Sequence, residues 1–296
     1  MRSFEEYKAL INENLTSFIP EVNKYSATVR DAMKYSLEIG GKRLRPVLLL
    51  AACDFAGGNI EEALPYAAAL EYIHTYSLIH DDLPAMDNDD FRRGKPTNHK
   101  VYGEAMAVLA GDGLLNTAAE VIASQLSLYF NNHDKLVNHA KAGAEIIRRA
   151  GINGMIGGQV ADVENEYNTA DSVLVEYIEE HKCGDLITAP VVAGLLLAGA
   201  EQHIIDDFEK YAMNMGIAFQ VLDDILDFEG DEKLIGKKVG KDKDIGKCNY
   251  VCVHSLDDAK AQLAQLTEAA VDALAKYGKS AEFFTELAEA MKIRKA

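Results

Sequence analysis

The sequence predicts an all-α protein, a single-domain barrel of ten or more helices around a deep central cleft. Apolar residues recur at three- and four-residue spacing along most of the chain, which is the periodicity of helices with a buried face. Sustained alternation of apolar and polar residues, the pattern of half-buried strands, is absent. No Pro-rich or Ser/Gly-rich linker interrupts the 296 residues, so we predict one domain over residues 1–296.

The helical pattern is clearest in six segments, which are Tyr66 to His80, Ala105 to Leu126, Leu136 to Arg149, Val173 to Glu180, Phe208 to Phe228 and Leu256 to Tyr277. Residues typical of turns fall outside these segments, at Gly40-Gly41, Gly57 to Asn59, Pro84, Gly94 to Pro96, Asn131-Asn132 and Gly230. Two stretches, Ala67 to Ile79 and Val191 to Ala200, are apolar nearly all round. We expect both to lie centrally, covered by the other helices.

The composition restricts the partners and the compartment. A formal charge of −17, from 47 acidic and 30 basic residues, disfavours nucleic acid and anionic lipid surfaces. Residues 1–15 contain three glutamates where a signal peptide needs a basic start and an apolar stretch. The longest largely apolar run, Thr188 to Ala200, is too short for a bilayer, and the four cysteines lack zinc-type spacing. We therefore expect a cytoplasmic protein with reduced thiols and no stable membrane association.

Two clusters of aspartate follow apolar helical segments. The first comprises Asp81, Asp82 and Asp87, and the second comprises Asp223, Asp224 and Asp227. In the second cluster, spacings of three and four place the carboxylates on one helix face, where they repel unless divalent cations are shared. In the first cluster, a helix break at Pro84 would let Asp87 turn back toward Asp81. A solvated helix end is the alternative explanation for either cluster alone, but two such clusters favour a metal site.

Mg²⁺ held by few carboxylates commonly takes further ligands from substrate phosphates, so basic residues nearby are informative. The Gly40-Gly41 turn is followed by three cations, Lys42, Arg43 and Arg45. Arg92 and Arg93 follow the first acidic cluster, and arginine can bind a diphosphate with two parallel hydrogen bonds. Basic pairs are also common on protein surfaces, so these residues indicate phosphate binding only together with the acidic clusters.

These segments together resemble the trans-polyprenyl diphosphate synthase family, particularly its bacterial farnesyl diphosphate synthases, from about Gly40 to Tyr250. Residues 73–87, continuing to Arg92-Arg93-Gly-Lys-Pro-Thr97, are similar to the first aspartate-rich motif of that family. Residues 219–227 resemble its second motif, and residues 154–159 resemble a further family segment. The resemblance implies the isoprenoid synthase fold and condensation of isopentenyl diphosphate with allylic diphosphates.

The resemblance also implies the role of each matching residue. Mg²⁺ on the allylic diphosphate would be held by Asp81, Asp82, Asp87, Asp223, Asp224 and Asp227. The same substrate would be bound by Arg92, Lys182, Cys183, Gln220 and Lys237. The diphosphate of isopentenyl diphosphate would be bound by Lys42, Arg45, His74 and Arg93. Without the motif, His74 would be interpreted as a histidine of a helical core.

The mechanism implied is metal-assisted ionisation of the allylic diphosphate, attack by the isopentenyl double bond, and loss of a proton. Mg²⁺ and the cations would stabilise charge on the leaving diphosphate, and no side-chain nucleophile is required. The two extra residues in the first motif and a bulky Tyr76, five residues before Asp81, go with a fifteen-carbon product in the resembling family. Tyr76 is thus the expected floor of the product tunnel, although a packed core aromatic is the alternative.

Three positions depart from the family pattern. Cys183 and Asn249 stand where threonine is usual, and Asn88 stands where aspartate is common. A thiol is a weaker donor than a hydroxyl, so Cys183 could weaken allylic binding. None of these changes removes an expected metal ligand or diphosphate-binding cation, so we predict an active enzyme and, from the resemblance, a homodimer.

Other functions are less favoured by the residues. Geranylgeranyl or geranyl diphosphate synthesis would need only a different tunnel depth. A terpene cyclase would mix Asn, Ser and Glu in the second motif, which here is aspartate at all three positions. A non-catalytic subunit of a prenyl synthase would typically lack one aspartate motif, and both are present.

Overall fold

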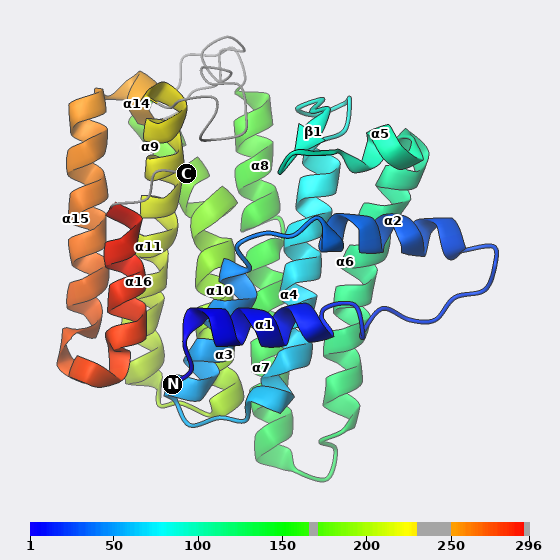
Figure 1. Cartoon of the computed structure of the whole chain (residues 1–296). Coiled ribbons are helices and arrows are strands. Elements are labelled where there is room, and N and C mark those ends of the chain that lie inside the picture. Colours follow the sequence, from blue (N-terminus) through cyan, green and yellow to red (C-terminus); the bar gives the residue numbers. More distant parts are fainter. Residues whose placement is uncertain (166–170, 230–249, 293–296) are drawn as a thin grey trace. The chain divides into compact units, whose positions relative to one another are not determined.

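The computed structural model describes residues 1–165, 171–229 and 250–292, and this part of the chain is almost entirely helical (Figure 1). The prediction of an all-α protein with ten or more helices is confirmed. Within the described residues, strand is confined to β1 (Phe91–Arg92) and β2 (Lys95–Pro96), which form an antiparallel hairpin. The chain forms two compact units, residues 1–143 with 193–199 and residues 144–192 with 200–296.

Each unit has its own set of helices. The first unit contains the hairpin and the helices α1 (Phe4–Asn14), α2 (Ala27–Glu38), α3 (Leu44–Phe55), α4 (Ile60–Asp81), α5 (Asn98–Tyr102) and α6 (Glu104–Ser127). The second unit contains α8 (Met155–Glu164), α9 (Ser172–Ile178), the π-helix η1 (Glu179–Gly184), α11 (Gln202–Glu229), α14 (Tyr250–Val253), α15 (Leu256–Leu274), the 3₁₀-helix η2 (Ala275–Ala281) and α16 (Glu282–Lys292). Helices α7 (His133–Ala150) and α10 (Asp185–Ala198) contribute residues to both.

Helix α4 is the central element of the first unit and packs along α6 (Figure 1). It is buried on nearly every side between Ala63 and Ile79, which confirms the expected central position. The helix begins at Ile60, earlier than the predicted start, because the Asn59 side chain accepts the Glu61 N–H at 2.9 Å and caps the first turn. This capped start and the close neighbour α6 fix where the acidic carboxyl-terminal end of α4 lies within the unit.

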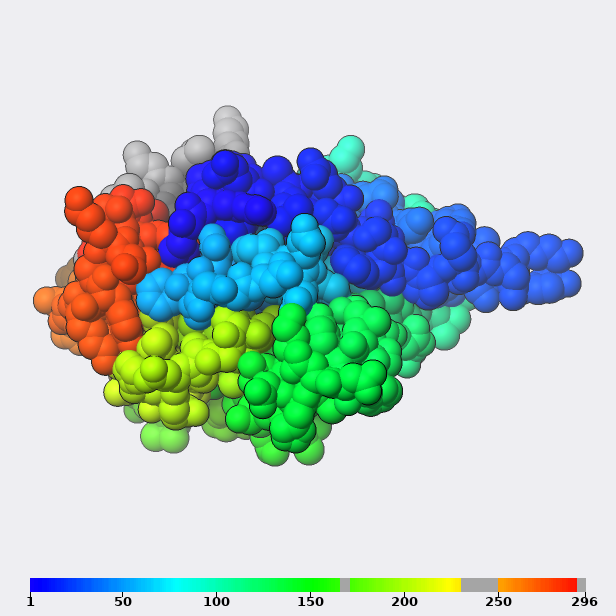
Figure 2. Space-filling view, turned by 90° about the horizontal axis from the view of Figure 1, so that it is seen from below, coloured from blue at the N-terminus to red at the C-terminus, as the bar shows by residue number. Residues whose placement is uncertain are grey.

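The segment between α1 and α2 extends from the edge of the first unit, where it is seen in blue in the space-filling view (Figure 2). Tyr25 in this segment is 86% exposed. The tip of the segment is thus exposed to solvent, whereas its first residue, Leu15, is buried and accepts a hydrogen bond from the Tyr72 hydroxyl of α4. We assign no site residue to this segment.

The second unit is built on α11, which packs along α15 (Figure 1). Its core includes the aromatic residues Phe208, Tyr211 and Phe284, and the Tyr211 hydroxyl donates to the Phe284 carbonyl oxygen at 2.8 Å. The π-helix η1 lies close to α8 and α11. A Cβ on Gly216 would lie 2.7 Å from the Gly184 Cα, so glycine is needed where α11 meets η1. π-Helical turns are rare and often occur at functional sites.

Two helical stretches are long and apolar enough to cross a membrane by length and composition alone. They are α6 and the run of residues 172–198 formed by α9, η1 and α10. In these stretches 44% and 67% of the apolar window is buried within the protein, and core helices pass the same test. Both stretches are therefore weak evidence for a membrane protein, and the expected lack of membrane association stays a prediction.

Gly194 provides a test of close helix packing in the first unit. A Cβ on Gly194 would overlap the carbonyl oxygen of Leu49 and lie 2.9 Å from the Ala52 Cβ, so backbone must move in Gly194→Ala. We expect this variant to lose about 1–3 kcal/mol of unfolding free energy, measured by urea denaturation. Gly113 is the matched control, because its Cβ would meet the flexible Met33 side chain closely and Val29 only at an ordinary contact distance of 3.6 Å. Gly113→Ala should be neutral or up to about 1 kcal/mol more stable, and equal losses in the two variants would contradict the packing argument.

Candidate functional site

The first acidic cluster forms where α4 ends. The helix ends at Asp81, and the chain turns through Pro84 until the Asp87 N–H donates to the Asp81 carbonyl oxygen at 2.9 Å. The predicted turn-back of Asp87 is thus confirmed in the backbone. Asn88 has a φ of 51°, a left-handed conformation that asparagine adopts more readily than most residues. Asparagine at position 88, where aspartate is common in the family, is therefore compatible with the backbone of this turn.

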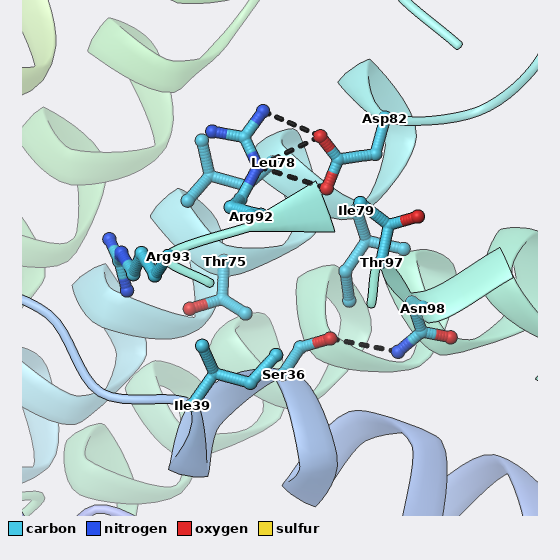
Figure 3. A pocket seen from close by; sticks show the side chains of 10 residues that line it. All are labelled: Ser36, Ile39, Thr75, Leu78, Ile79, Asp82, Arg92, Arg93, Thr97 and Asn98. Carbon is cyan, nitrogen blue, oxygen red and sulfur yellow. Dashed lines mark hydrogen bonds and ion pairs between the residues drawn. The ribbon is translucent and has the colours of Figure 1, made fainter. Parts of the chain in front are cut away.

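Asp82 is the most enclosed carboxylate of this cluster and is paired with Arg92. Arg92 Nε lies 2.8 and 2.9 Å from the two carboxylate oxygens, and Nη2 lies 2.6 Å from Oδ1 (Figure 3). Asp82 is 3% exposed, and this burial raises the pKa of its carboxyl above the ordinary value, against the opposing effect of Arg92. Arg92 thus compensates a carboxylate that would be costly to bury alone.

A two-residue hairpin turn presents Arg92 and Arg93. Arg93 and Gly94 have φ values of 52° and 74°, as a type I′ turn requires. Thr97 anchors the hairpin, since its N–H donates to the Asp90 carbonyl oxygen at 3.0 Å and its hydroxyl to the Asp89 carbonyl oxygen at 2.7 Å. The sequence indicated a turn here but not the two short strands.

A small cavity of about 20 Å³ lies beneath the hairpin (Figure 3). Its polar lining is supplied by Ser36, Thr75, Asp82, Arg92, Arg93, Thr97 and Asn98. The Asn98 side-chain amide donates to Ser36 Oγ at 2.8 Å. The volume suits about one water molecule, so the cavity is too small for a diphosphate. Its polar bonds instead hold α2 against the segment that follows the hairpin.

His74 lies among cations on α4. Exclusion of water lowers the pKa of its imidazole well below the usual value, and repulsion from Arg45 and Arg93 lowers it further. The ring is therefore neutral at physiological pH, with one nitrogen able to donate and the other able to accept. Three of the four residues expected to bind isopentenyl diphosphate are thus brought together in the first unit.

The fourth such residue, Lys42, is exposed on the loop that follows Gly40 and Gly41. Arg93 Nη1 donates to the Gly40 carbonyl oxygen. A Cβ on Gly41 would lie 2.5 Å from that same nitrogen, so a larger residue there would require the Arg93 guanidinium to move. Arg43 departs from the expected set of three phosphate-binding cations, because it points inward and pairs with Glu71. Sequence periodicity could not reveal this choice of partner.

In the second unit, Lys182 projects from the π-helix η1. Its Nζ lies 2.5 Å from Oδ2 of Asp162, a residue of α8 that follows the segment 154–159. A Cβ on Gly158 would overlap the Lys182 backbone nitrogen, so α8 and η1 are in close contact. Asp162 was missed in the sequence, although it lies one turn after Gln159, at the end of the singled-out segment.

A chain of hydrogen bonds connects Cys183, which stands where the family usually has threonine, to the second acidic cluster. The Cys183 thiol donates to Gln220 Oε1 at 2.7 Å, and Gln220 Nε2 donates to Asp224 Oδ1 at 2.8 Å. The other Asp224 oxygen accepts the Tyr250 N–H at 3.0 Å. Asp224 is 3% exposed. The thiol therefore orients the Gln220 amide. The amide oxygen faces the thiol, and the amide nitrogen faces the Asp224 carboxylate.

The remaining second-cluster aspartates, Asp223 and Asp227, are partly exposed on α11. Glu179, the first residue of η1, was missed by sequence analysis. It is 3% exposed, its Oε1 has no hydrogen-bond partner in the part of the chain that the structure describes, and burial together with nearby Asp224 raises its pKa to about 8. Glu179 and Glu180 are two consecutive glutamates of the kind common on helix surfaces, so nothing in the sequence indicates that Glu179 is buried. Lys237 and Asn249 lie outside the described residues.

The donor set can be tested against Mg²⁺. Among the described residues, no three His, Cys, Asp or Glu side chains converge closely enough to enclose an ion by themselves. Each unit instead offers a small group of aspartates, some partly exposed. This fits Mg²⁺, which is commonly held by one or two carboxylates, with water and substrate phosphate completing the shell. The expectation that both clusters share the same cations joins residues of two units and stays a prediction.

Comparison with known proteins adds independent findings. The model of the family described as polyprenyl synthetase matches residues 26–287. The chain is 46% identical over 265 residues to a farnesyl diphosphate synthase of Geobacillus stearothermophilus, covering 90% of this chain and 88% of that protein. It is 45% identical over 267 residues to a geranylgeranyl diphosphate synthase of Cyanophora paradoxa, covering 90% and 86%. The structure resembles an FPP/GFPP synthase of Zymomonas mobilis, with a TM-score of 0.84 and 31% identity over 97% of this chain and 96% of that chain.

The hydrogen bond from Cys183 can be tested with matched variants. Cys183→Ala removes the donor, whereas Cys183→Thr and Cys183→Ser retain a hydroxyl that can donate to Gln220. We expect Cys183→Ala to weaken binding of inorganic diphosphate with Mg²⁺ about twofold to twelvefold in calorimetric titrations, as loss of roughly 0.5–1.5 kcal/mol implies. Both hydroxyl variants should bind at least as tightly as the natural protein. Equal affinities for the alanine and threonine variants would show that the thiol does not orient Gln220.

Proposed function

Since the chain belongs to the polyprenyl synthetase family and is a short-chain trans-prenyl diphosphate synthase, we propose that its product is farnesyl diphosphate. The substrates would be isopentenyl diphosphate with dimethylallyl and then geranyl diphosphate. The observation that supports this product is Tyr76, buried on α4 just over one turn before Asp81. Relatives carry both farnesyl and geranylgeranyl names, so a longer product on the same scaffold is the second candidate.

For the allylic substrate, we propose that Mg²⁺ is held by the aspartates of both clusters, which are Asp81, Asp82, Asp87, Asp223, Asp224 and Asp227. When bound, Mg²⁺ would act as a Lewis acid toward the leaving diphosphate. Arg92 and Lys182 would add positive charge where negative charge develops. Both side chains are already held by carboxylates, Arg92 by Asp82 and Lys182 by Asp162, so their positions are set before substrate binds. Lys237 is proposed from the resemblance alone.

For isopentenyl diphosphate, we propose that Lys42, Arg45 and Arg93 supply the charge and His74 supplies a neutral hydrogen bond. A neutral imidazole can donate without adding to the repulsion among the neighbouring cations. The proton lost at the end of the reaction would pass to the departing diphosphate, so no side-chain base is assigned.

Tyr76 is the proposed floor of the product tunnel. Its ring packs edge-on against His80, with 5.7 Å between centroids, and its hydroxyl has no hydrogen-bond partner among the described residues. A buried hydroxyl without a partner adds no stability, so the bulk of the ring is the feature that matters. Each further five-carbon unit would gain about 0.8 kcal/mol per buried CH₂, so only a steric stop can limit growth.

The assembly and location are proposals as well. Val108, Leu109 and Leu115 are exposed on α6 by 41%, 46% and 39%, and we propose that a second copy of the chain covers them. Helices α7 and α10 each belong to both compact units, which supports a single domain over residues 1–296. The acidic surface is consistent with a cytoplasmic protein that binds neither nucleic acid nor membrane stably.

The proposed function is tested by incubating the purified protein with isopentenyl diphosphate, dimethylallyl diphosphate and Mg²⁺. We expect farnesyl diphosphate as the main product by chromatography, and no product when EDTA removes the metal. A twenty-carbon product would replace the first candidate by the second. The absence of condensation with either dimethylallyl or geranyl diphosphate would favour a non-catalytic subunit.

The floor is tested separately by changing Tyr76. Tyr76→Ala should shift the products toward twenty carbons or more, because the ring no longer blocks the chain. Tyr76→Phe is the matched control, since it keeps the ring and removes only a hydroxyl that has no partner. It should make the same product as the natural protein with equal or higher stability. Unchanged product length in Tyr76→Ala would assign the floor to another residue.

A further inference from the structure

Arg43 lies between two residues proposed to bind isopentenyl diphosphate, but it faces the interior. Lys42 precedes it, and Arg45 follows in the first turn of α3. Arg43 is only 5% exposed and has a φ of 55°. A left-handed conformation is unfavourable for a side chain of this size and persists only where the surroundings impose it.

Three elements hold the Arg43 guanidinium. Nη1 donates to Glu71 Oε1 at 2.6 Å, Nη2 donates to the Leu37 carbonyl oxygen at 2.5 Å, and Nε donates to Asn12 Oδ1 at 3.1 Å. These partners belong to α4, α2 and α1 respectively. The single side chain therefore ties the loop of residues 40–43 to three helices of the first unit.

The Arg43–Glu71 pair is almost fully buried, with side-chain exposures of 4% and 3%. Buried ion pairs often add no net stability over apolar residues of similar volume, because both charges must leave water. A contribution to folding stability is thus a poor explanation for the presence of this buried pair. A pair of this kind can instead fix one particular arrangement of the elements it connects, because either charge alone would be unfavourable.

The arrangement fixed here joins the two parts of the isopentenyl site. Glu71 lies three residues before His74 on α4, and residues at this spacing are neighbours on the surface of a helix. Arg43 is the chain neighbour of Lys42 and is two residues from Arg45. The pair therefore connects the loop that carries these cations to the turn of α4 that carries His74. Burial lowers the pKa of the Arg93 guanidinium, and the negative charge of Glu71 opposes that shift.

We propose that Arg43 and Glu71 are positioning residues for isopentenyl diphosphate, holding Lys42 and Arg45 in register with His74. The inference rests on the proposed assignment of these residues to that substrate. Neither member of the pair touches the substrate in this proposal. Their loss should therefore weaken isopentenyl diphosphate binding selectively, with little effect on the allylic diphosphate.

Three variants separate positioning from general stability. Glu71→Gln removes the charge but keeps the shape, and Arg43→Lys keeps the charge but loses the fork of donors. The double variant Arg43→Met/Glu71→Leu replaces the pair by apolar residues of similar volume. Glu62→Gln is the control, because Glu62 lies in the first turn of the same helix and also loses an ion pair, with Lys135 at 2.6 Å.

Calorimetric titration of isopentenyl diphosphate without metal measures this site alone, and steady-state kinetics give KM for both substrates. We expect Glu71→Gln and Arg43→Lys to weaken isopentenyl diphosphate binding about tenfold, or about 1.4 kcal/mol, with KM for geranyl diphosphate within about twofold. The double variant should unfold near the natural temperature yet retain the weakened binding. Glu62→Gln should leave binding of both substrates unchanged.

Two results would overturn the proposal. One is normal isopentenyl diphosphate affinity in folded Glu71→Gln and Arg43→Lys. The other is a double variant that is as stable as the natural protein and also binds isopentenyl diphosphate with the natural affinity. The pair would then have a purely structural role. If the natural protein binds isopentenyl diphosphate without condensing it, the proposed function fails while the variant titrations still decide the positioning role. If the natural protein does not bind it, both fail.

Discussion

Repulsion between carboxylates at the ends of apolar helices is the constraint on which the site depends. Each unit relieves it in a different way. In the first unit, Arg92 contacts both oxygens of the buried Asp82. In the second unit, Asp224 receives neutral donors, the Gln220 amide and the Tyr250 N–H. The most buried aspartate of each cluster is thereby satisfied within the protein, and the partly exposed aspartates are the ones better placed for a cation that also contacts water and phosphate.

The balance of charge within the first unit explains how an acidic protein can accept anionic substrates. The chain carries a formal charge of −17, yet Arg45, Arg92 and Arg93 all lie near His74. Burial lowers the pKa of that imidazole, and repulsion from these cations lowers it further, so the ring stays neutral. Two of these cations depend on neighbours for their position, Arg92 on Asp82 and Arg93 on the Gly40 carbonyl oxygen. A locally positive site is therefore compatible with a negative surface, as long as the cations are held in place.

The sequence predicted the features that follow from local pattern. The helices, the central position of α4 and the turn at Pro84 agree with the structure, because periodicity and proline chemistry act over a few residues. The inward Arg43, the buried Glu179 and the π-helix were not predictable in this way. Each depends on which distant side chain lies opposite, and the positive φ of Arg43 and Arg93 has no signature in residue type. The metal and substrate assignments came from resemblance to a family, not from periodicity.

Identity of 45% to a geranylgeranyl and 46% to a farnesyl diphosphate synthase leaves the product of this chain unsettled. The residues proposed to hold diphosphate and metal are charged, and two of them, Arg92 and Lys182, are paired with carboxylates of other elements. Substituting one of these two would leave its buried partner uncompensated, which is unfavourable. Tyr76 differs, because its hydroxyl has no partner in the described part of the chain and its ring is held by shape alone. Under the proposal that Tyr76 is the tunnel floor, a change of size there would alter the room for the product without unpairing any charged residue. The same proposal would account for relatives that carry farnesyl and geranylgeranyl names at nearly equal identity to this chain.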